Sequence, residues 1–414
     1  MTDAAAVLRF TQKLAVIVLV ALALRIGIRL VLGTQTYWVD GYGHYASLAQ
    51  SLCAGHGYAF PGQGPTAFRV PLYPMFIALT TCGQGSPWPL IVAQALASSL
   101  TCLLAGLIAR RMAGDGAGLL AAAIYALWPY AAWHDVSLQE SGLHAFLAAL
   151  ATWLLIRLRD QGGIRRAMIC GAALGLLLLT RSTMLPFAVV ALVMVAVSAR
   201  GAARVLSAII AAAAMIAVLS PWLAWQKQVT GAYGLGTEGG AALYAGNHRL
   251  TFSAYPERSI DESRANVFAA LTPAEQADLA RHGAGAAARD AWFRGKAIKA
   301  IAANPTAFVS GACRKLWAAF GPMPTPRHGL IGDLGYAVIW TPFVLAALAG
   351  MVLRRRLWRD DLMLHAHLLT FCATTTLFWA QTSHRSYLDP YLAVFAACAL
   401  MAIAPQSLRK WLSR

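Results

Sequence analysis

Charged residues are scarce in this sequence. Only 12% of its 414 residues are Asp, Glu, Lys or Arg, whereas 58% are hydrophobic. A soluble domain carries about a quarter charged residues, so this composition excludes an ordinary soluble globular protein. The apolar residues gather in runs that approach or reach the ~20 residues needed to cross a bilayer. The sequence therefore predicts an all-α integral membrane protein, organised as a single polytopic domain over residues 1–414.

Cysteine and clustered acidic residues are also in short supply. The seven cysteines are scattered, and no CxxC pair or Cys/His cluster at metal-ligand spacing occurs. Neither a zinc site nor a disulfide framework is therefore predicted. The absence of a DxD motif gives no support to a divalent metal cofactor, so we expect none. Cys53 and Cys82 fall outside the predicted spans, but their positions do not decide whether they pair.

The net charge of +17 comes from basic residues in short loops between apolar runs. This is the positive-inside pattern of membrane proteins, and it argues against a nucleic-acid partner. The pattern predicts a multi-pass inner (plasma) membrane protein with both termini in the cytoplasm. The first span follows Arg9 and Lys13 without a cleavage site, so we interpret it as a retained signal-anchor.

About ten transmembrane helices are predicted from the lengths of the runs. They cover residues 14–33, 89–109, 117–132, 141–157, 167–180, 184–199, 205–223, 334–353, 362–380 and 390–404. Two long connections, residues 34–88 and 224–333, are then predicted to lie outside. In the second, residues 290–305 and 307–320 alternate bulky apolar and basic residues at helical spacing. Such helices lie either on the membrane surface or on the connection's own core.

The first outer connection opens with an isolated acid, in "TYWVDGYGHYASLAQSLCAGHGYAF". A helix from Asp40 to about Cys53 would place His44 on the same face as Asp40. Asp40 is either the N-cap of this helix or a functional carboxylate.

An arginine follows in "AFRVPLYPMFIAL", where Arg69 precedes Pro71 and Pro74. Proline in a first helical turn leaves N–H groups and the positive end of the helix dipole exposed. An arginine beside such an end suits a phosphate. The alternative is an arginine that extends along the membrane interface.

These two stretches together resemble the first outer loop of the GT-C superfamily of membrane glycosyltransferases. The similarity is to the branch that contains protein O-mannosyltransferases and the aminoarabinose transferases of lipid A. Three further stretches fit the same family and extend the resemblance over nearly the whole chain: "GAALGLLLLTRSTMLPFA", "PWLAWQKQVTGAYGLGTEGGAALYAGNH" and "HRSYLDPYLAVFAACAL".

The resemblance implies transfer of a sugar from a polyprenyl phosphate to a lipid, glycan or protein acceptor. In these enzymes transfer takes place on the outer face of the membrane, with inversion at the anomeric carbon. It assigns Asp40 as the general base and Arg69 to the lipid phosphate. Many relatives have a second acid directly after the aspartate, whereas Gly41 stands here. This departure speaks against a metal site at that position.

Five other positions are candidates. Glu140, in "SLQE", either completes a capping box with Ser137 or contacts the acceptor. Arg181 and Arg385 lie near span ends, where they either bind the lipid phosphate or extend to the interface. His44 and Asn247 are candidates for contact with acceptor or sugar, and surface polarity explains His44 equally well.

Two other functions remain open. A lipid-linked glycan flippase or transporter would also be polytopic and basic, but would more often carry polar groups near the middle of its spans. A ligase or polymerase on the same superfamily frame would use a lipid-linked oligosaccharide as donor. The sequence determines neither the sugar nor the acceptor.

Overall fold

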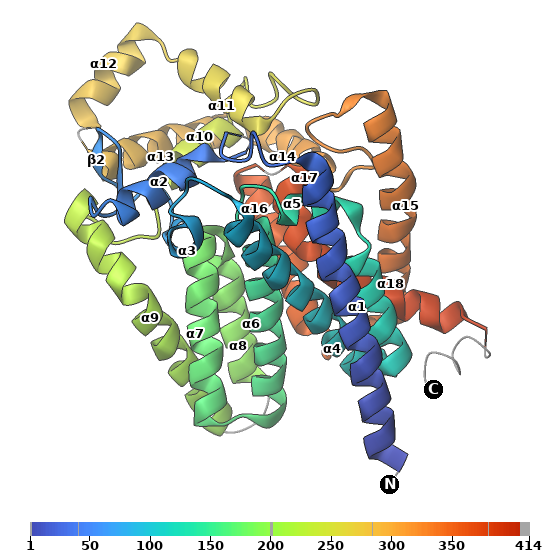
Figure 1. Ribbon diagram of the computed structural model, residues 1–414. Coiled ribbons are helices and arrows are strands. Elements are labelled where there is room, and N and C mark those ends of the chain that lie inside the picture. The colour runs from blue at the N-terminus through green and yellow to red at the C-terminus, as the bar shows by residue number, and fades with distance from the viewer. Residues whose placement is uncertain (1, 40, 199–201, 284, 380, 406–414) are drawn as a thin grey trace.

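The computed structural model describes residues 2–39, 41–198, 202–283, 285–379 and 381–405, and they are mostly α-helical (Figure 1). The first helices are α1 (Thr2–Leu32), α2 (Gly43–Cys53), α3 (Leu72–Thr81), α4 (Trp88–Ala126), α5 (Pro129–Asp135), α6 (Ser141–Gln161), α7 (Ile164–Thr180), α8 (Leu185–Val197) and α9 (Ala202–Thr230). The later helices are α10 (Gly239–Gly246), α11 (Ile260–Ala269), α12 (Pro273–His282), α13 (Ala286–Ala303), α14 (Pro305–Phe320), α15 (Gly329–Leu353), α16 (Leu362–Leu377), α17 (Thr382–Arg385) and α18 (Asp389–Ile403). Two short strands, β1 (Ala59–Phe60) and β2 (Gly64–Pro65), pair antiparallel, and short 3-10 turns lie at Ser182–Met184, Arg355–Leu357 and Ser386–Leu388.

Six helical segments of the described chain are long and apolar enough to cross a membrane. They are Ala4–Leu32, Trp88–Ala126, Ser141–Gln161, Ala203–Thr230, Gly329–Leu353 and Thr382–Ile403. Apolar helices also occupy the predicted spans at 184–199 and 362–380, but they are shorter. The membrane architecture is therefore present, and the number of ten spans stays a prediction.

Helix α4 is a hairpin of two helical halves. Ala113 and Gly114 leave the helical conformation, with Gly114 at φ 84°. A side chain at Gly106 would meet the carbonyl oxygen of Gly118 at 3.1 Å, although twelve residues of straight helix would span about 18 Å. The chain therefore reverses at Gly114, and the halves occupy the predicted spans 89–109 and 117–132.

The predicted span 117–132 is interrupted near its end. Trp128 has an extended backbone (φ −68°, ψ 105°), and α5 begins at Pro129. The ring of a proline disfavours the helical conformation of the residue before it. The helix therefore stops at Ala126, and the short helix α5 turns toward the next connection.

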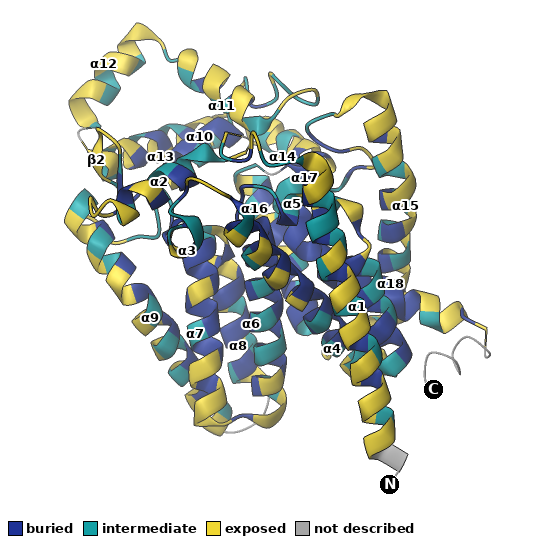
Figure 2. Ribbon diagram, in the orientation of Figure 1, coloured by how far each residue is buried: buried dark blue, intermediate teal, exposed yellow. Residues whose placement is uncertain are grey.

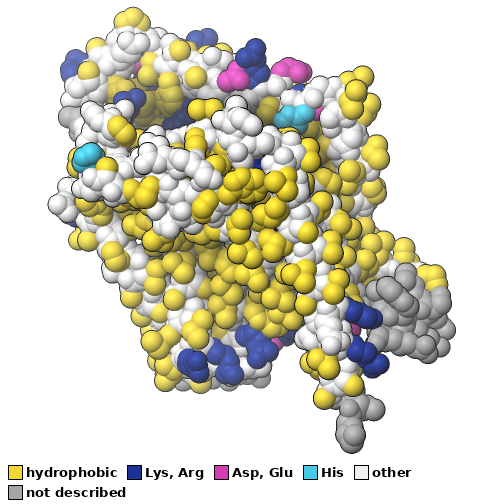
Figure 3. Space-filling view, in the orientation of Figure 1, with side chains coloured by type: hydrophobic (Ala, Val, Ile, Leu, Met, Phe, Trp, Pro, Cys, Tyr) yellow, Lys and Arg dark blue, Asp and Glu magenta, His cyan; other side chains and the backbone are white. Residues whose placement is uncertain are grey.

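The two long connections lie together at one end of the bundle, opposite the N-terminal end of α1 (Figure 1). Lys and Arg side chains line the other, lower end, and the middle of this face is hydrophobic (Figure 3). Several of them are paired there, as in Arg111 with Asp160 at 2.7 Å and Arg354 with Asp361 at 2.8 Å. The charges thus gather at the ends of the bundle, where water reaches them.

The hydrophobic core runs through the interior of the bundle, whereas α12 is exposed (Figure 2). A smaller core lies within the second connection, where Phe293 and Ala297 of α13 pack on Tyr244 and Val267. The helix predicted at 290–305 is thus present as α13 and packs on the connection's own core. The helix predicted at 307–320 is present as α14, whose Trp317 is exposed.

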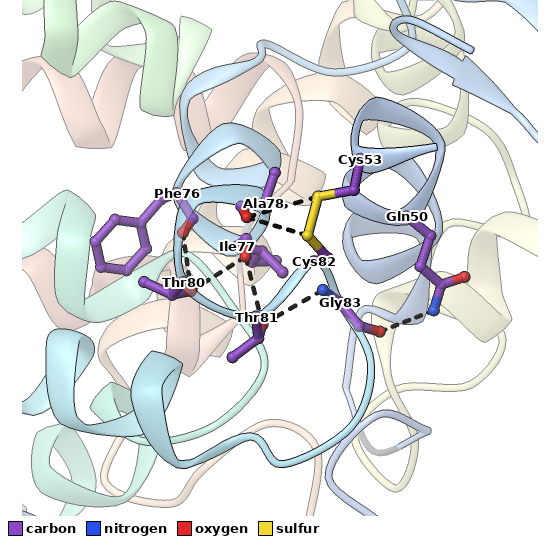
Figure 4. Close-up of a disulfide and its surroundings, with 9 residues drawn as sticks. All are labelled: Gln50, Cys53, Phe76, Ile77, Ala78, Thr80, Thr81, Cys82 and Gly83. Atoms are coloured by element: carbon purple, nitrogen blue, oxygen red, sulfur yellow. Dashed lines mark hydrogen bonds between the residues drawn. A yellow bond between two sulfur atoms is a disulfide. The ribbon is translucent and has the colours of Figure 1, made fainter. Parts of the chain in front are cut away.

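A disulfide joins the end of α2 to the end of α3 (Figure 4). Its cysteines are Cys53 and Cys82, whose Cα atoms are 5.8 Å apart. Beside it, the Gln50 side chain donates a hydrogen bond to the carbonyl oxygen of Gly83 at 2.8 Å. The sequence did not decide whether Cys53 and Cys82 form a disulfide, and the structure shows that they do. The bond ties α2 to α3, the two helices of the first connection.

Replacing both cysteines with serine should lower the free energy of unfolding by about 3–4 kcal/mol, because the bond closes a loop whose ends are 29 residues apart. The measurement is thermal or denaturant unfolding of the purified protein in detergent. The matched control is Cys313→Ser, which replaces an exposed free thiol and should leave unfolding unchanged. A double variant that unfolds like the wild type would contradict the prediction.

Candidate functional site

A cavity of about 710 Å³ lies where the first connection, the turn between α7 and α8, helix α9 and the second connection meet. Its upper part carries arginine and carboxylate side chains. Its other part is apolar and lies along α9, beside the start of α8. A concave site with few convergent polar groups is typical of small-molecule binding, so this cavity is the candidate functional site.

Arg69 reaches the polar part from the segment before α3. The Tyr58 hydroxyl donates to the carbonyl oxygen of Arg69 at 3.0 Å, and the Trp225 indole donates to that of Thr66 at 2.9 Å. The backbone of this segment is thus held to the β hairpin and to α9. The Arg69 Nε is buried without a hydrogen-bond partner, and no described carboxylate forms an ion pair with its guanidinium.

Arg181 and Glu140 form the second polar element of the cavity wall. Arg181 ends α7, and its Nε lies 3.4 Å from Oε1 of Glu140. The other oxygen of Glu140, Oε2, is buried without a partner. The alternative capping box is not formed, because α6 begins only at Ser141 and the Ser137 hydroxyl donates to the Trp133 carbonyl oxygen.

The second connection adds three charged residues that the sequence analysis did not identify. Arg264 of α11 pairs with Glu238, and Asp261 lies in the first turn of the same helix. Burial and the charge of Arg69 lower the pKa of Arg264 to about 10. Burial raises the pKa of Asp261, and Arg69 opposes that rise. These groups were missed because only the folding of a long connection brings them to Arg69.

The apolar part of the cavity is lined by Leu185 of α8 and by Met215, Ile216 and Leu219 of α9. Leu185 is 42% exposed and Ile216 is 54% exposed. Large apolar side chains that are exposed on a membrane helix face lipid. The cavity therefore extends from a charged part at the end of the bundle to the lipid-facing surface.

Comparison with known proteins identifies the fold. The family model described as dolichyl-phosphate-mannose-protein mannosyltransferase matches residues 66–225. The oligosaccharyltransferase AglB from Archaeoglobus fulgidus, in complex with an inhibitory peptide and a dolichol-phosphate, matches with a TM-score of 0.55 at 14% identity. The match covers 95% of this chain and 50% of that one. The chain thus shares its fold with AglB over nearly its whole length, in agreement with the resemblance to the GT-C superfamily.

The apo form of AglB gives the same TM-score of 0.55 at 14% identity, with the same coverage of 95% and 50%. ArnT from Cupriavidus metallidurans, bound to undecaprenyl phosphate, matches at 15% identity over 96% of this chain and 78% of that one, with a TM-score of 0.33. No curated protein sequence matches. This chain spans about half the length of AglB, and at this identity the likeness is one of fold.

Asp40, the predicted general base, lies outside the described residues. The helix that follows begins at Gly43 with Tyr42 at its N-cap position, so it starts later than the predicted Asp40. Gly41 has a φ of 87°, and a side chain there would meet the carbonyl oxygen of Leu138 at 2.9 Å. A second acid at this position would be both strained and obstructed, which explains the glycine.

Arg385 does not line the cavity, contrary to its predicted place at a lipid phosphate. Its side chain is fully buried and lies over the Trp340 ring, 3.5 Å from the centroid. It donates to the Tyr336 hydroxyl at 2.9 Å and pairs with Asp389 at 3.4 Å. Its neighbour His384 lines the cavity instead.

Asn247 does not line the cavity either, because it joins the second connection to the bundle. Its amide donates to the carbonyl oxygens of Leu243 and Leu377, and its oxygen accepts from Lys315. Lys315 also donates to the carbonyl oxygen of Thr376, at 2.8 Å. These side chains satisfy the last carbonyl groups of α16. Both N–H donors of the Asn247 amide are therefore used within the protein.

His44 packs behind Arg69 and is not part of the cavity wall. Its ring lies 4.3 Å from that of Tyr45 and 5.8 Å from that of Phe68, and its Nε2 is buried without a partner. Burial and the nearby charge of Arg69 lower the pKa of His44 to about 4. The imidazole is therefore neutral at physiological pH, and positive charge in this part of the site comes from arginine.

No group of three or more His, Cys, Asp and Glu residues that could hold a metal ion is found in the described part of the chain.

His44→Phe should make the protein less sensitive to acid. Between about pH 6.5 and pH 4 the unfolded chain binds a proton at this histidine that the folded chain does not, so the free energy of unfolding falls as the pH falls through this window. Melting temperatures in detergent at about pH 5 and about pH 7.5 test this. The melting temperature of the variant should rise relative to that of the wild type at the lower pH only. The same gain at both values, or an equal effect of replacing exposed His56, would contradict it.

Proposed function

We propose that this chain transfers a sugar from a polyprenyl-phosphate donor to an acceptor, with inversion at the anomeric carbon. The observation that carries the proposal is the cavity, which joins arginine side chains to an apolar part at the lipid-facing surface. A polyprenyl phosphate has the same two parts, an anionic head and a long hydrocarbon tail. The description of the matching family and the dolichol-phosphate in the AglB complex support this donor class.

The lipid phosphate would bind Arg69 and Arg181. Guanidinium groups donate paired hydrogen bonds to phosphate oxygens, and Arg69 has a buried donor that no described group satisfies. The tail would lie along Leu185, Ile216 and Leu219, on α9 beside the start of α8. Arginine charge would then stabilise the phosphate as it leaves, in a site that the lipid shields from water.

The reaction needs a base as well as a leaving group. In the proposed step Asp40 takes the proton of the acceptor hydroxyl, and the hydroxyl oxygen forms a bond to the anomeric carbon. The bond from that carbon to the phosphate oxygen breaks, and its electron pair leaves with the polyprenyl phosphate. Glu140, with one unpartnered oxygen, would accept a hydrogen bond from the acceptor. The proposal requires no divalent metal, and Gly41 supports this because a second acid has no room there.

The charges of the cavity favour a donor with one phosphate over a lipid-linked oligosaccharide on a diphosphate. Arg181 and Arg264 each have a carboxylate partner, Glu140 and Glu238. Arg69 alone has no ion-pair partner in the described part of the chain. One uncompensated guanidinium matches the small charge of a monophosphate ester better than that of a diphosphate.

We also propose that the site faces the outside of an inner membrane, with both termini in the cytoplasm. Two features support this side. Basic side chains line the opposite end of the bundle (Figure 3), as the positive-inside rule expects of a cytoplasmic end. The Cys53–Cys82 disulfide lies in the first connection, at the same end of the bundle as the site. Disulfides persist in oxidising compartments.

Asp40→Asn should lower the turnover of sugar transfer by about 10²–10⁴-fold, the usual contribution of a general base. Purified protein would be given defined polyprenyl-phosphate sugars and a mixture of acceptors, and the released polyprenyl phosphate measured. Glu257→Gln, at an exposed site of the second connection, is the control and should have wild-type turnover. Full activity in Asp40→Asn would remove the general-base assignment. If the wild type releases no polyprenyl phosphate from any donor, the transporter alternative is favoured.

Arg69→Ala should weaken binding of polyprenyl phosphate about tenfold to hundredfold, since a hydrogen bond to a charged group contributes about 1.5–3 kcal/mol. Arg69→Lys should recover part of the affinity, because it keeps the charge and loses the paired geometry. Titration with a fluorescent polyprenyl phosphate measures both. Arg249→Ala removes an exposed arginine nearby and should bind normally. Equal affinity of Arg69→Ala and wild type would exclude Arg69 from the phosphate site.

A further inference from the structure

Gln94 of α4 joins the two parts of the chain that carry the proposed site. It is fully buried, and no pattern in the sequence distinguishes it. Its Nε2 donates to the carbonyl oxygens of Asp135 at 2.9 Å and Ser137 at 2.8 Å. Its Oε1 accepts from the hydroxyls of Tyr37 at 3.3 Å and Tyr73 at 3.1 Å. An amide has two N–H donors and an oxygen with two lone pairs, so its capacity is filled.

The chemistry of these partners fixes the orientation of the amide. Carbonyl oxygens only accept hydrogen bonds, so the NH₂ group must face Asp135 and Ser137. The two phenol hydroxyls then donate to the oxygen. No other uncharged side chain of this length offers two donors and a double acceptor together. The position therefore selects glutamine by hydrogen bonding as well as by volume.

The four hydrogen-bond partners of Gln94 are close in sequence to the proposed functional residues. Tyr37 precedes Asp40 in the first connection, and Tyr73 follows Arg69 at the start of α3. Ser137 precedes Glu140, which pairs with Arg181. One buried amide thus connects the segment of the proposed base and phosphate ligand with the segment of the proposed acceptor ligand.

Asp135 is held by its side chain as well as by its carbonyl oxygen, so the residue that Gln94 bonds has a fixed position. Its carboxylate pairs with the buried Arg25 at 3.1 Å and also accepts from the Ser98 hydroxyl. Arg25 further donates to the carbonyl oxygens of Ala21 and Ala126, both at 3.2 Å. Loss of the Gln94 bonds therefore frees the residues that follow Asp135, while Arg25 keeps Asp135 itself in place.

We infer that Gln94 is a positioning residue, which sets the distance between the phosphate-binding groups of the first connection and Glu140. This inference rests on the proposed function. Displacement of a reacting group by about 1 Å costs about a hundredfold in rate. The two sides of the amide act on different steps: the carbonyl side positions Glu140 for the acceptor, and the phenol side holds the segment that binds the lipid phosphate.

The two sides can be removed separately. Gln94→Glu keeps the oxygen that accepts from both phenols and, when its carboxyl is ionised, loses the donors. At alkaline pH its kcat should therefore fall at least about tenfold while KM for the lipid donor changes less than about twofold. Tyr37→Phe with Tyr73→Phe keeps the donors and loses the phenol bonds. That double variant should weaken binding of polyprenyl phosphate about tenfold.

The pH profile of Gln94→Glu separates positioning from a structural role. Burial raises the pKa of a carboxyl group, and the protonated form donates through its O–H to one of the carbonyl oxygens. The kcat of this variant, relative to wild type, should therefore rise as the pH is lowered. Protonation of the buried carboxyl also stabilises the folded variant, so kcat is expressed per folded protein, with the folded fraction measured at each pH. A relative kcat that falls or stays flat would overturn the inference.

Gln94→Met and Thr101→Val keep the experiment decisive if the glutamate variant does not fold. Gln94→Met retains the volume without the bonds, and Thr101→Val removes a buried hydroxyl of the same helix that bonds only to Ala97. In hydrogen–deuterium exchange, residues 34–39 and 135–140 should both exchange faster in Gln94→Met and at wild-type rate in Thr101→Val. Unchanged exchange in Gln94→Met would overturn the inference. Faster exchange in a protein without transferase activity would reject the proposed function alone.

Discussion

A helix bundle in hydrocarbon carries unpaired charge stably only at its ends, because a charged group among lipid tails has neither water nor counter-ions. This constraint determines where chemistry takes place in the present chain. The charged residues of the cavity come from four connections that are far apart in sequence, yet all four leave the bundle at the same end (Figure 1). The apolar part of the cavity continues downward between helices, where no charge is found. A ligand with a charged head and an apolar tail fits this cavity, because the cavity also has a charged part and an apolar part.

Buried charges inside the described bundle serve a second purpose, which is to fix helix ends. Arg25 with Asp135 joins α1 to α5, and Arg385 with Asp389 lies under Trp340 of α15. Such pairs gain little net stability over apolar contacts. Removal of one partner is costly, however, because it leaves the other charge buried alone. The segments that carry the proposed functional groups are therefore held in one arrangement rather than in several.

The sequence predicted most of what depends on local pattern. The apolar runs identified the membrane helices, and Arg69, Arg181 and Glu140 were singled out and lie on one cavity wall. The residues that depend on distant packing were not predictable. Asp261 and Arg264 approach Arg69 only through the fold of the second connection. Arg385 has the same local pattern as a surface arginine, and only the tertiary contact with Trp340 shows that it is buried.

The junction between the second connection and α16 has a consequence for how ligands reach the cavity. Asn247 and Lys315 hold the last carbonyl groups of α16, and a side chain at Gly246 would collide with the carbonyl oxygen of Phe378. Phe378 and Trp379 line the cavity, so the hydrogen bonds that close this junction also set the position of one cavity wall. We expect a membrane-borne molecule to enter past the exposed apolar side chains of Leu185 and Ile216, on a route separate from that of a partner arriving through water.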